Sequence, residues 1–411
     1  MKSETTEIAV IGAGPGGSMA ATLLRQRGWR VTLLERSTFP RFSIGESLLP
    51  QCMEWLEQAG MMDAMKAAGF QHKRGAAFSE RDLYGELDYA EHYSPGWTWT
   101  WEVQRATFDQ VMANEAQRQG VDVRFEQTVT AIDISQAGAP LLQISNANGE
   151  DYELQAQFVC DGSGFGRVLP RLLKLDKPSS QPPRTSVFTH IEDHISCPNY
   201  DREKILLTVH PTHKDVWYWL IPFSNGRASL GVTGNPEVVQ TRASNPTDLL
   251  RELVHAEPRL KRLLANAVFD DPVRTVNNYA VSVSSMYGRD YALLGNAGEF
   301  IDPVFSSGVT LAMKSGVLAC DLIDRHLRGQ ATDWPNEFEA PLRAGSEVFR
   351  VFVEGWYDGS LRDVFFDPNP NLEIRAMLCS ILAGYVWDQN NPYVAKPQRR
   401  LRALCHSCKP H

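Results

Sequence analysis

The chain has 411 residues, of which 43% are apolar, and its formal net charge is −8. This length allows two closely packed domains and a C-terminal region. This acidic net charge gives no electrostatic footprint for nucleic acid, so DNA and RNA are disfavoured as partners. No apolar run approaches the roughly 18 residues of a membrane span, and the polar start lacks the pattern of a signal peptide. We therefore expect a soluble, cytoplasmic protein without a membrane span.

The cysteines indicate reduced thiols rather than a structural framework. Seven of them are scattered along the chain, and an odd number does not suit a set of disulfides. Only Cys405 and Cys408 form a CxxC pair. A zinc site needs a second pair of ligands, and none is evident in the pattern. We predict no metal site.

The N-terminal stretch has the pattern of a dinucleotide-binding turn. An apolar strand ending at Ile11 is followed by Gly12, Gly14 and Gly17 in GxGxxG spacing, and then by a predicted helix to about residue 26. The glycines permit a tight turn and a close approach of the backbone to a pyrophosphate, while the helix N-terminus favours negative charge. Glu35 ends the next strand, at the distance expected for a carboxylate that binds ribose hydroxyls. Together these features predict a bound dinucleotide.

Three tryptophans follow in the first third of the chain. Trp97, Trp99 and Trp101 alternate with threonines, so an extended backbone would place their indoles on one face. They flank an aromatic substrate or form an aromatic ladder in the core. Around them we predict a helix over residues 45–59, a helical run that follows Arg105 and continues to residue 119, and strands within residues 121–158.

The second half of the chain has the pattern of an antiparallel sheet followed by helices. Prolines within residues 171–185 indicate a loop between the two halves. Period-2 patterns then predict an antiparallel sheet from residues 185–190, 205–210, 216–222 and 227–232. Asn245 is expected to cap a helix over residues 246–264, with a break at Pro258. Later elements are predicted as strands over residues 278–283 and 291–294 and helices over residues 307–327 and 375–386.

The stretch from Val216 to Pro222 reads VWYWLIP. Trp217 and Trp219 share one face of an extended strand, and Pro222 cannot donate to a ladder, so alone this pattern indicates a core strand. Three further stretches accompany it in order, namely GAGPGG, GFQHKRGAAF and FIDPVFSSG. In combination they resemble the flavin-dependent halogenases, whose signature is WxWxIP. The similarity is closer to the phenol and pyrrole halogenases than to the tryptophan halogenases.

The resemblance implies an α/β fold with three parts. A Rossmann-like FAD-binding domain of the glutathione-reductase or hydroxylase type would comprise residues 1–75, 102–180 and 285–330. An antiparallel-sheet substrate domain would be inserted as residues 76–101 and 181–284. A helical C-terminal region would follow over residues 331–411, either as a cap on the substrate pocket or as a packed appendage.

The resemblance also implies how FAD is held. The Gly-Glu-Ser of residues 45–47 would lie along the flavin, and a second turn, Asp161-Gly162, would contact FAD. Asn296 stands where aspartate is more common in the family. The implied cofactor-binding residues are Gly12, Gly14, Gly17, Glu35, Arg36, Glu46, Ser47, Arg105, Asp161, Gly162, Asn296, Pro303 and Gly308.

Lys73 is the sharpest candidate for a catalytic residue. A lysine is most often a solvated surface charge. Here it matches the family's active-site lysine, which would receive the halogen from hypohalous acid. A partly buried, neutral amine would be the form able to react. The resemblance implies a tunnel through which hypohalous acid passes from the flavin to this lysine. Trp217 and Trp219 would form a wall on the flavin side of that tunnel and obstruct direct oxygen transfer to substrate.

The halide would lie at the start of the helix that begins near residue 307. Ser307 and Gly308 match the family's halide-site pair. Phe305-Ser306 replaces the Glu-Ser of the tryptophan halogenases, so the acid that polarises free tryptophan is missing. The substrates that remain are electron-rich aromatics of phenolic, resorcinol-like or pyrrolic type, free or carried by an acyl carrier protein.

The implied reaction uses FADH2, O2 and chloride or bromide, through a hydroperoxyflavin and hypohalous acid. The sequence has a single GxGxxG turn, and the resemblance favours supply of FADH2 by a separate flavin reductase. The basic C-terminal stretch, which includes Arg399 and Arg400, would dock an acidic carrier protein or is simply a solvated tail. Alternative functions are an FAD-dependent monooxygenase or hydroxylase, a geranylgeranyl-reductase-like oxidoreductase, or a catalytically silent flavin-binding partner.

Overall fold

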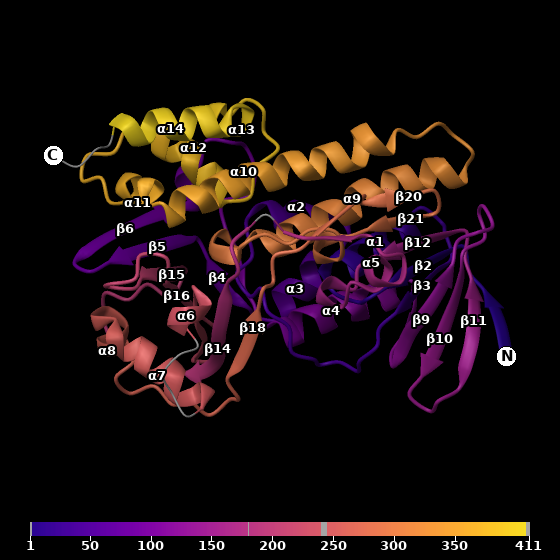
Figure 1. The fold of residues 1–411 in the computed structure, drawn as a ribbon, viewed down its shortest axis with the longest axis horizontal. Helices are drawn as coiled ribbons and strands as arrows, with labels where there is room; N and C mark the ends of the chain where they lie inside the picture. The colour runs from indigo at the N-terminus through magenta and orange to yellow at the C-terminus, as the bar shows by residue number, and fades with distance from the viewer. Residues whose placement is uncertain (1, 180, 240–244, 408–411) are drawn as a thin grey trace.

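The computed structural model describes residues 2–179, 181–239 and 245–407. Two large β-sheets lie beside each other, with helices packed around them and the C-terminal helices across one end (Figure 1). The α/β class and the helical C-terminal region are confirmed. Cys408 and Lys409 lie outside the described residues, so the CxxC pair and the end of the basic tail are not placed.

The first large sheet is mostly parallel and carries the dinucleotide turn. Its central strands are buried along their whole length, as expected for strands covered on both faces. Only the β20–β21 pair is antiparallel among its described strands. In spatial order the strands are β20 (Tyr287–Gly288), β21 (Tyr291–Leu293), β12 (Phe158–Asp161), β2 (Ile8–Ile11), β3 (Val31–Leu34) and β8 (Asp122–Arg124).

Three long helices pack with this sheet. α1 (Pro15–Gln26) follows β2 directly and contacts both α4 (Arg105–Arg118) and α9 (Ser307–Leu327). The helices predicted for residues 18–26, for the run after Arg105 and for residues 307–327 are present, and the second of them already begins at Arg105. A separate sheet consists of β1 (Lys2–Thr5), β11 (Asp151–Gln155), β10 (Leu141–Asn146) and β9 (Gln127–Asp133).

The second large sheet holds the tryptophan motif. It is antiparallel except for the β15–β5 pair, which is parallel. Its order is β18 (Arg274–Asn277), β14 (Thr185–Glu192), β17 (Arg227–Gly234), β16 (Trp217–Pro222), β15 (Lys204–Val209), β5 (Gly75–Glu80) and β6 (Leu83–Asp88). All four strands predicted between residues 185 and 232 are present.

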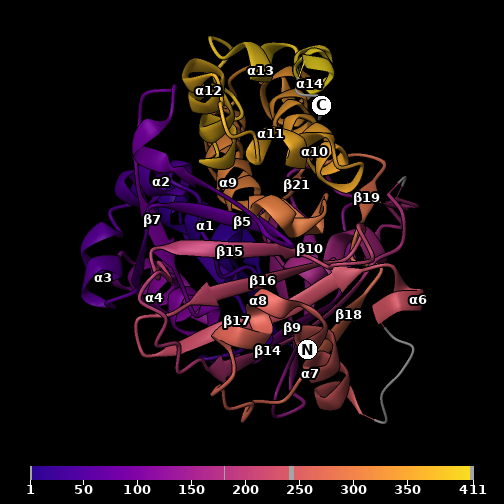
Figure 2. The same cartoon turned by 90° about the vertical axis from the view of Figure 1, so that its left-hand side faces the viewer.

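The two faces of this sheet pack against different helices (Figure 2). Trp217 and Trp219 lie in a core shared with the C-terminal helices, whereas Tyr218 and Leu220 lie in a core on the opposite face with α7. The alternation predicted for residues 216–222 is thus confirmed. The helices on the second face are α6 (Pro236–Val239), α7 (Pro246–Ala256) and α8 (Pro258–Leu263).

The C-terminal helices complete the core above the tryptophan face. They contribute Phe349, Phe352 and Trp356 to the cluster that contains Trp217. This packing makes the region an integral layer of the fold. Its helices are α10 (Ala340–Tyr357), α11 (Ser360–Phe365), α12 (Leu372–Leu382), α13 (Pro392–Ala395) and α14 (Pro397–Ser407).

Several predicted boundaries were wrong. The helix expected over residues 45–59 begins only at Gln51, because Ser47 pairs with Glu102 in an isolated bridge and the backbone before Gln51 is not helical. The strand expected over residues 278–283 is interrupted, since β18 ends at Asn277 and Asn278 has a φ of 50°. The tryptophan stretch is a strand only over residues 100–102.

Other predictions hold at finer detail. Asn245 caps α7 by accepting a hydrogen bond from the Asp248 amide, and Pro258 begins a separate helix. The smaller helices near the first sheet are α2 (Gln51–Gln58), α3 (Met62–Ala67) and α5 (Val168–Leu172). There are also two two-stranded sheets. In one, β4 (Gln71–Lys73) pairs with β7 (Thr100–Glu102), and in the other, β13 (Asp176–Lys177) pairs with β19 (Ser282–Val283). Within the described residues, no helix has the length and apolar character to cross a membrane.

Candidate active site

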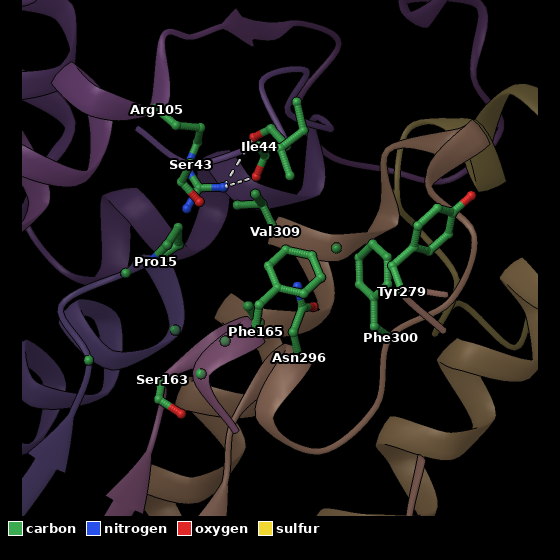
Figure 3. A pocket seen from close by; sticks show the side chains of 18 of the residues that line it. Pro15, Ser43, Ile44, Arg105, Ser163, Phe165, Tyr279, Asn296, Phe300 and Val309 are labelled. Carbon is green, nitrogen blue, oxygen red and sulfur yellow. Dashed lines mark hydrogen bonds between the residues drawn. The ribbon is translucent and has the colours of Figure 1, made fainter. Parts of the chain in front are cut away.

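A cavity of about 890 Å³ lies between the two large sheets. It starts at the glycine turn after β2 and extends to the tryptophans of β16 and the N-terminal end of α9. All of the predicted cofactor residues except Gly17 and Asp161 line it. Trp217 and Trp219 line it as well, whereas Lys73 and Ser307 lie behind its wall. Figure 3 shows the part of this cavity around Arg105, Phe165 and Asn296.

The glycine turn is packed too closely for a side chain at Gly12 and Gly17. A Cβ on Gly17 would lie 2.0 Å from the carbonyl oxygen of Gly12, and a Cβ on Gly12 would lie 2.7 Å from that of Gly162. Gly12 also has a φ of 90°, which other residues rarely adopt. Gly17 thus serves the site by letting α1 approach the turn, which leaves the helix N-terminus facing the cavity.

Glu35 is held by the turn that it is expected to serve. One carboxylate oxygen accepts a hydrogen bond from the Ala13 amide at 3.0 Å, and the other accepts from the Ser37 amide at 3.1 Å. Arg41 lies 3.3 Å from the same carboxylate and also pairs with Asp109. This carboxylate is therefore fixed at the end of β3, at the edge of the cavity.

Arg105 fixes the segment that precedes α2. Its guanidinium makes a bidentate pair with Asp109 and donates to the Ile44 carbonyl at 2.6 Å (Figure 3). Gly45, with a φ of 102°, turns the backbone toward the cavity next to this contact. Asp109 was not predicted as a site residue, and its signal in the sequence is only its i+4 spacing from Arg105.

Glu46 lies in the cavity wall, and only one of its two carboxylate oxygens has a hydrogen-bond partner. His190 on β14 lies 2.6 Å from one carboxylate oxygen. The other oxygen is buried and has no hydrogen-bond partner. Since buried polar atoms are nearly always paired, this oxygen is an open position for a polar atom of a ligand in the cavity.

The other turns bring further predicted residues to the cavity. Asp161 is fully buried, and its carboxylate accepts hydrogen bonds from the Ser163 and Leu169 amides, so it shapes the turn without lining the cavity. Burial raises the pKa of Asp161. Gly162 and Asn296 do line the cavity. Phe165 and Phe300 meet edge to face at 5.2 Å beside Asn296 (Figure 3).

Phe165 and Phe300 were missed by the sequence analysis. Both lie within or just after motifs that had been quoted, so adjacency to a motif was the available signal. Among the described residues, no group of histidine, cysteine, aspartate or glutamate side chains is arranged to hold a metal ion.

The start of α9 forms another wall. Ser306 has a φ of 58° and lines the cavity together with Pro303 and Gly308. Ser307 is the first residue of the helix and is 1% exposed, so its side chain is not at the cavity surface. Ser306, Gly308 and Val309 line the cavity, so the start of α9, whose first amides have no acceptor within the helix, borders it.

Trp219 lies flat against the sheet at this end. Its ring occupies the space above Gly231, where a Cβ would lie 2.2 Å from the indole. Its Nε1 donates to the Ser229 hydroxyl at 3.0 Å. The neighbouring Trp217 lies 5.8 Å away between ring centroids. The two indoles therefore form the continuous wall that the sequence predicts.

Trp217 is fixed by a network that joins all three parts of the fold. Its Nε1 donates to the Tyr357 hydroxyl at 2.8 Å, and that hydroxyl donates to Asp302 at 2.7 Å. Tyr279 donates to the same carboxylate oxygen at 3.1 Å. The Arg184 guanidinium lies 4.0 Å from the centre of the Tyr357 ring. The network thus connects β16, the segment before α9 and the end of α10.

Tyr357→Phe should destabilise the protein by about 1–3 kcal/mol, because it leaves the buried Trp217 Nε1 without an acceptor. Urea unfolding followed by tryptophan fluorescence measures this change. Tyr93→Phe is the matched control, since Tyr93 is 44% exposed. Equal unfolding midpoints for the two variants would contradict a stabilising role for the network.

Lys73 is buried directly behind the cavity wall. It is 1% exposed, and its Nζ donates to the Ser47 hydroxyl at 2.7 Å and to the Leu48 carbonyl at 2.8 Å. Burial lowers the pKa of Lys73 to about 8. Ser47 lines the cavity, so a single side chain separates the amine from it. A neutral amine has two N–H groups, and with both donated its lone pair is left free.

The shape and chemistry of the cavity suit FAD. The close glycine turn and the helix N-terminus of α1 would accommodate the pyrophosphate, and Glu35 stands where a ribose would lie. The unpartnered oxygen of Glu46 offers a polar contact farther along. The apolar wall of Trp217 and Trp219 suits an aromatic ring system.

Comparison with known proteins agrees with this geometry. The family model of an FAD binding domain matches residues 5–335. The chain is 28% identical to the 1H-pyrrole-2-carbonyl (peptidyl-carrier protein) brominase of Pseudoalteromonas luteoviolacea, over 93% of this chain and 92% of the relative. It is 31% identical to the flavin-dependent halogenase armH3 of Armillaria mellea, over 80% of this chain and 69% of the relative.

A solved structure has nearly the same fold. It is a flavoprotein/dehydrogenase from Cytophaga hutchinsonii, which is 43% identical, with a TM-score of 0.96 and coverage of 98% of this chain and 99% of the other. Residues 5–335 carry the FAD binding domain, and armH3 relates the chain to enzymes named for halogenation. The chain belongs to the flavin-dependent halogenases, a family of FAD-dependent enzymes.

Proposed function

We propose that this protein is an FADH2- and O2-dependent halogenase that acts on an electron-rich aromatic ring of phenolic, resorcinol-like or pyrrolic type. The observation that carries the proposal is the position of Lys73, a buried amine bonded to Ser47 behind the wall of the cavity. Its hydrogen-bond acceptors are a hydroxyl and a carbonyl rather than a carboxylate, which is unusual for a buried amine that serves only stability. Its burial favours the neutral form that reacts with an electrophilic halogen.

The residues that line the cavity would hold FAD along its length. The turn at Gly12 and Gly14 would bind the pyrophosphate, and Glu35 the ribose. Glu46, Asn296 and the start of α9 would surround the isoalloxazine. When bound in reduced form, the cofactor supplies with O2 the two-electron oxidation of a halide: FADH2, O2, halide and a proton give FAD, hypohalous acid and water.

The halide would be held at the first turn of α9. Ser306, in the left-handed conformation, and Gly308 line the cavity at this turn, where its backbone amides would be available to an anion. Helix N-terminal amides favour an anion. Ser307 would contribute through its backbone, since its side chain is buried.

Lys73 would then carry the halogen. Its lone pair attacks the halogen of hypohalous acid, an N–halogen bond forms, and water leaves. The aromatic carbon next attacks that halogen, the N–halogen bond breaks, and the proton lost by the ring returns to the amine. Trp217 and Trp219 would keep substrate from the flavin, so that halogenation replaces oxygen transfer.

The partners follow from the same scheme. A separate flavin reductase would supply FADH2. Arg399, Arg400 and Arg402 are exposed on α14, and together with Lys396 they offer a basic surface to an acidic carrier protein. The brominase relative is named for a substrate on a peptidyl-carrier protein, which supports a carrier-bound substrate here as a further proposal.

The experiment that tests the function needs no knowledge of the substrate. Protein loaded with reduced FAD is mixed with oxygen in a stopped-flow spectrometer, with and without bromide or chloride. We expect at least one halide to accelerate the final phase of flavin reoxidation about tenfold or more. Identical reoxidation in every halide, together with NAD(P)H oxidation by the protein alone, would instead favour the hydroxylase alternative.

A further inference from the structure

The short sheet of β4 and β7 sorts its side chains onto two faces. Lys73 pairs with Thr100, and His72 pairs with Trp101. Paired residues share a face and neighbours along a strand alternate, so Glu102 lies on the same face as Lys73 and Thr100. The opposite face carries the tryptophan ladder, in which His72 stacks on Trp99 at 5.0 Å between ring centroids.

The tryptophan ladder belongs to the core. Trp97, Trp99 and Trp101 contact one another edge to face in succession, and Trp101 is buried. Of the two alternatives left open by the sequence, the structure shows the ladder. The polar residues of the Lys73 face are therefore the ones that require an explanation.

Glu102 is an unpaired carboxyl group in the interior. It is 1% exposed, and neither carboxylate oxygen has a hydrogen-bond partner. Thr100 is fully buried with its hydroxyl also unpartnered, and the buried Tyr200 hydroxyl has none either. Such groups cost roughly 1–3 kcal/mol each when they stay unpaired, so Glu102 and Thr100, on the same sheet face as Lys73, point to a ligand that pairs with them.

We propose that Glu102, with Thr100, forms the polar end of the aromatic substrate's binding site, where the carboxyl accepts a hydrogen bond from the ring O–H or N–H. The proposal rests on the proposed function, because Lys73 supplies the halogen beside it. It restricts the substrate to aromatics that carry a free hydroxyl or ring N–H. The corresponding ethers and N-alkyl rings would be excluded.

The chemistry of the substrate agrees with this placement. A hydroxyl or ring N–H is the substituent that makes the neighbouring ring carbons electron-rich. If Glu102 anchors that substituent on the same sheet face as Lys73, an activated carbon is held near the amine. Glu102 on β7 would thus supply the carboxyl group that the tryptophan halogenases have at the position of Phe305.

The electrostatics add a second property. Burial raises the pKa of Glu102 well above its usual range, while Lys73 acts to lower it. A neutral carboxyl both accepts and donates a hydrogen bond. Glutamine reproduces both functions in the same shape, whereas leucine removes them and leaves a well-packed apolar residue.

Binding to the FAD-loaded protein tests the proposal by isothermal titration calorimetry. The probes are two matched pairs, resorcinol with 1,3-dimethoxybenzene and pyrrole with N-methylpyrrole. For at least one pair, wild-type protein should bind the member with the free O–H or N–H at least tenfold more tightly. Glu102→Leu should lose this preference, and Glu102→Gln should keep most of it.

The controls separate this proposal from folding and from the proposed function. Glu102→Leu removes an unpartnered buried carboxyl, so it should fold at least as stably as wild type and retain FAD. Glu57→Leu makes the same change at an exposed position of α2 and should leave the preference unchanged. A preference that survives in Glu102→Leu, or its absence for both pairs in wild type, overturns the proposal. A halide-independent flavin reoxidation would overturn only the proposed function.

Discussion

Replacing Lys73 with methionine should lower the yield of halogenated aromatic product by at least about 100-fold. FAD binding and the acceleration of flavin reoxidation by halide should persist, because Lys73 lies behind the cavity wall and does not line it. Methionine fills a similar volume, so the change removes the amine with little change in packing. The combination of lost product and retained halide response would assign to Lys73 the transfer step alone.

Product is measured by mass spectrometry after reaction with resorcinol or pyrrole in the presence of bromide. Lys66→Met, which changes an exposed lysine of α3, is the matched control. If Lys73→Met retains product formation at the control level, halogen transfer does not use this amine. If it loses the halide response as well, Lys73 acts earlier than proposed.

The pH dependence provides an independent readout. Because the pKa of Lys73 is lowered to about 8, the neutral fraction falls about tenfold per pH unit below that value. Product per flavin oxidised should therefore rise toward pH 8 and then level off. Between pH 8 and 10.5 the lysine is still protonated in the unfolded chain but already neutral in the folded protein. The free energy of unfolding of the wild type should therefore rise by up to about 3 kcal/mol relative to that of Lys73→Met over this range.

Gly17→Ala should lower the affinity for FAD by at least about 100-fold. The new Cβ would lie 2.0 Å from the Gly12 carbonyl oxygen, so α1 must move away from the turn. The helix N-terminus would then no longer be positioned for the pyrophosphate. A stability loss of a few kcal/mol should accompany this shift, since the displaced helix packs against α4 and α9.

Retained FAD after ultrafiltration, and flavin fluorescence during titration, measure the affinity. Gly28→Ala is the control at the other end of α1, where a Cβ would meet no atom within 4 Å and only a φ of 97° opposes the change. This control should cost about 1 kcal/mol and retain FAD. Equal FAD loss in both variants would show that general destabilisation, and not the turn, determines binding.

The parts of the site that follow from short-range patterns could be predicted from the sequence. The glycine turn, Glu35 and the common face of Trp217 and Trp219 depend on spacing along one segment, so the fold had little freedom to alter them. Lys73 was placed by its matching motif, and the structure buries it more completely than the partial burial that was expected. The start of α2 was misjudged because Ser47 pairs with Glu102 in an isolated bridge between distant segments, a contact that no local pattern records.

The missing parts of the site share a long separation in sequence. Asp302 and Tyr357 meet Trp217 across three segments, and each is unremarkable within its own stretch. Glu102 was passed over because the adjacent tryptophans drew the prediction to the opposite face of β7. The hydrogen bond between Lys73 and Ser47 likewise joins two distant residues, of which the sequence analysis predicted the first as catalytic and the second as cofactor-binding.

The link from Trp217 through Tyr357 to Asp302 limits how this enzyme can be re-engineered. Exchanging the C-terminal helices with those of a relative is an obvious route to a new substrate range. Such a chimera would carry away the hydroxyl that orients an indole of the cavity wall. A donor segment is compatible only if it supplies a tyrosine at the end of α10. Selecting donor segments that carry this tyrosine would therefore avoid most of the chimeras that fail.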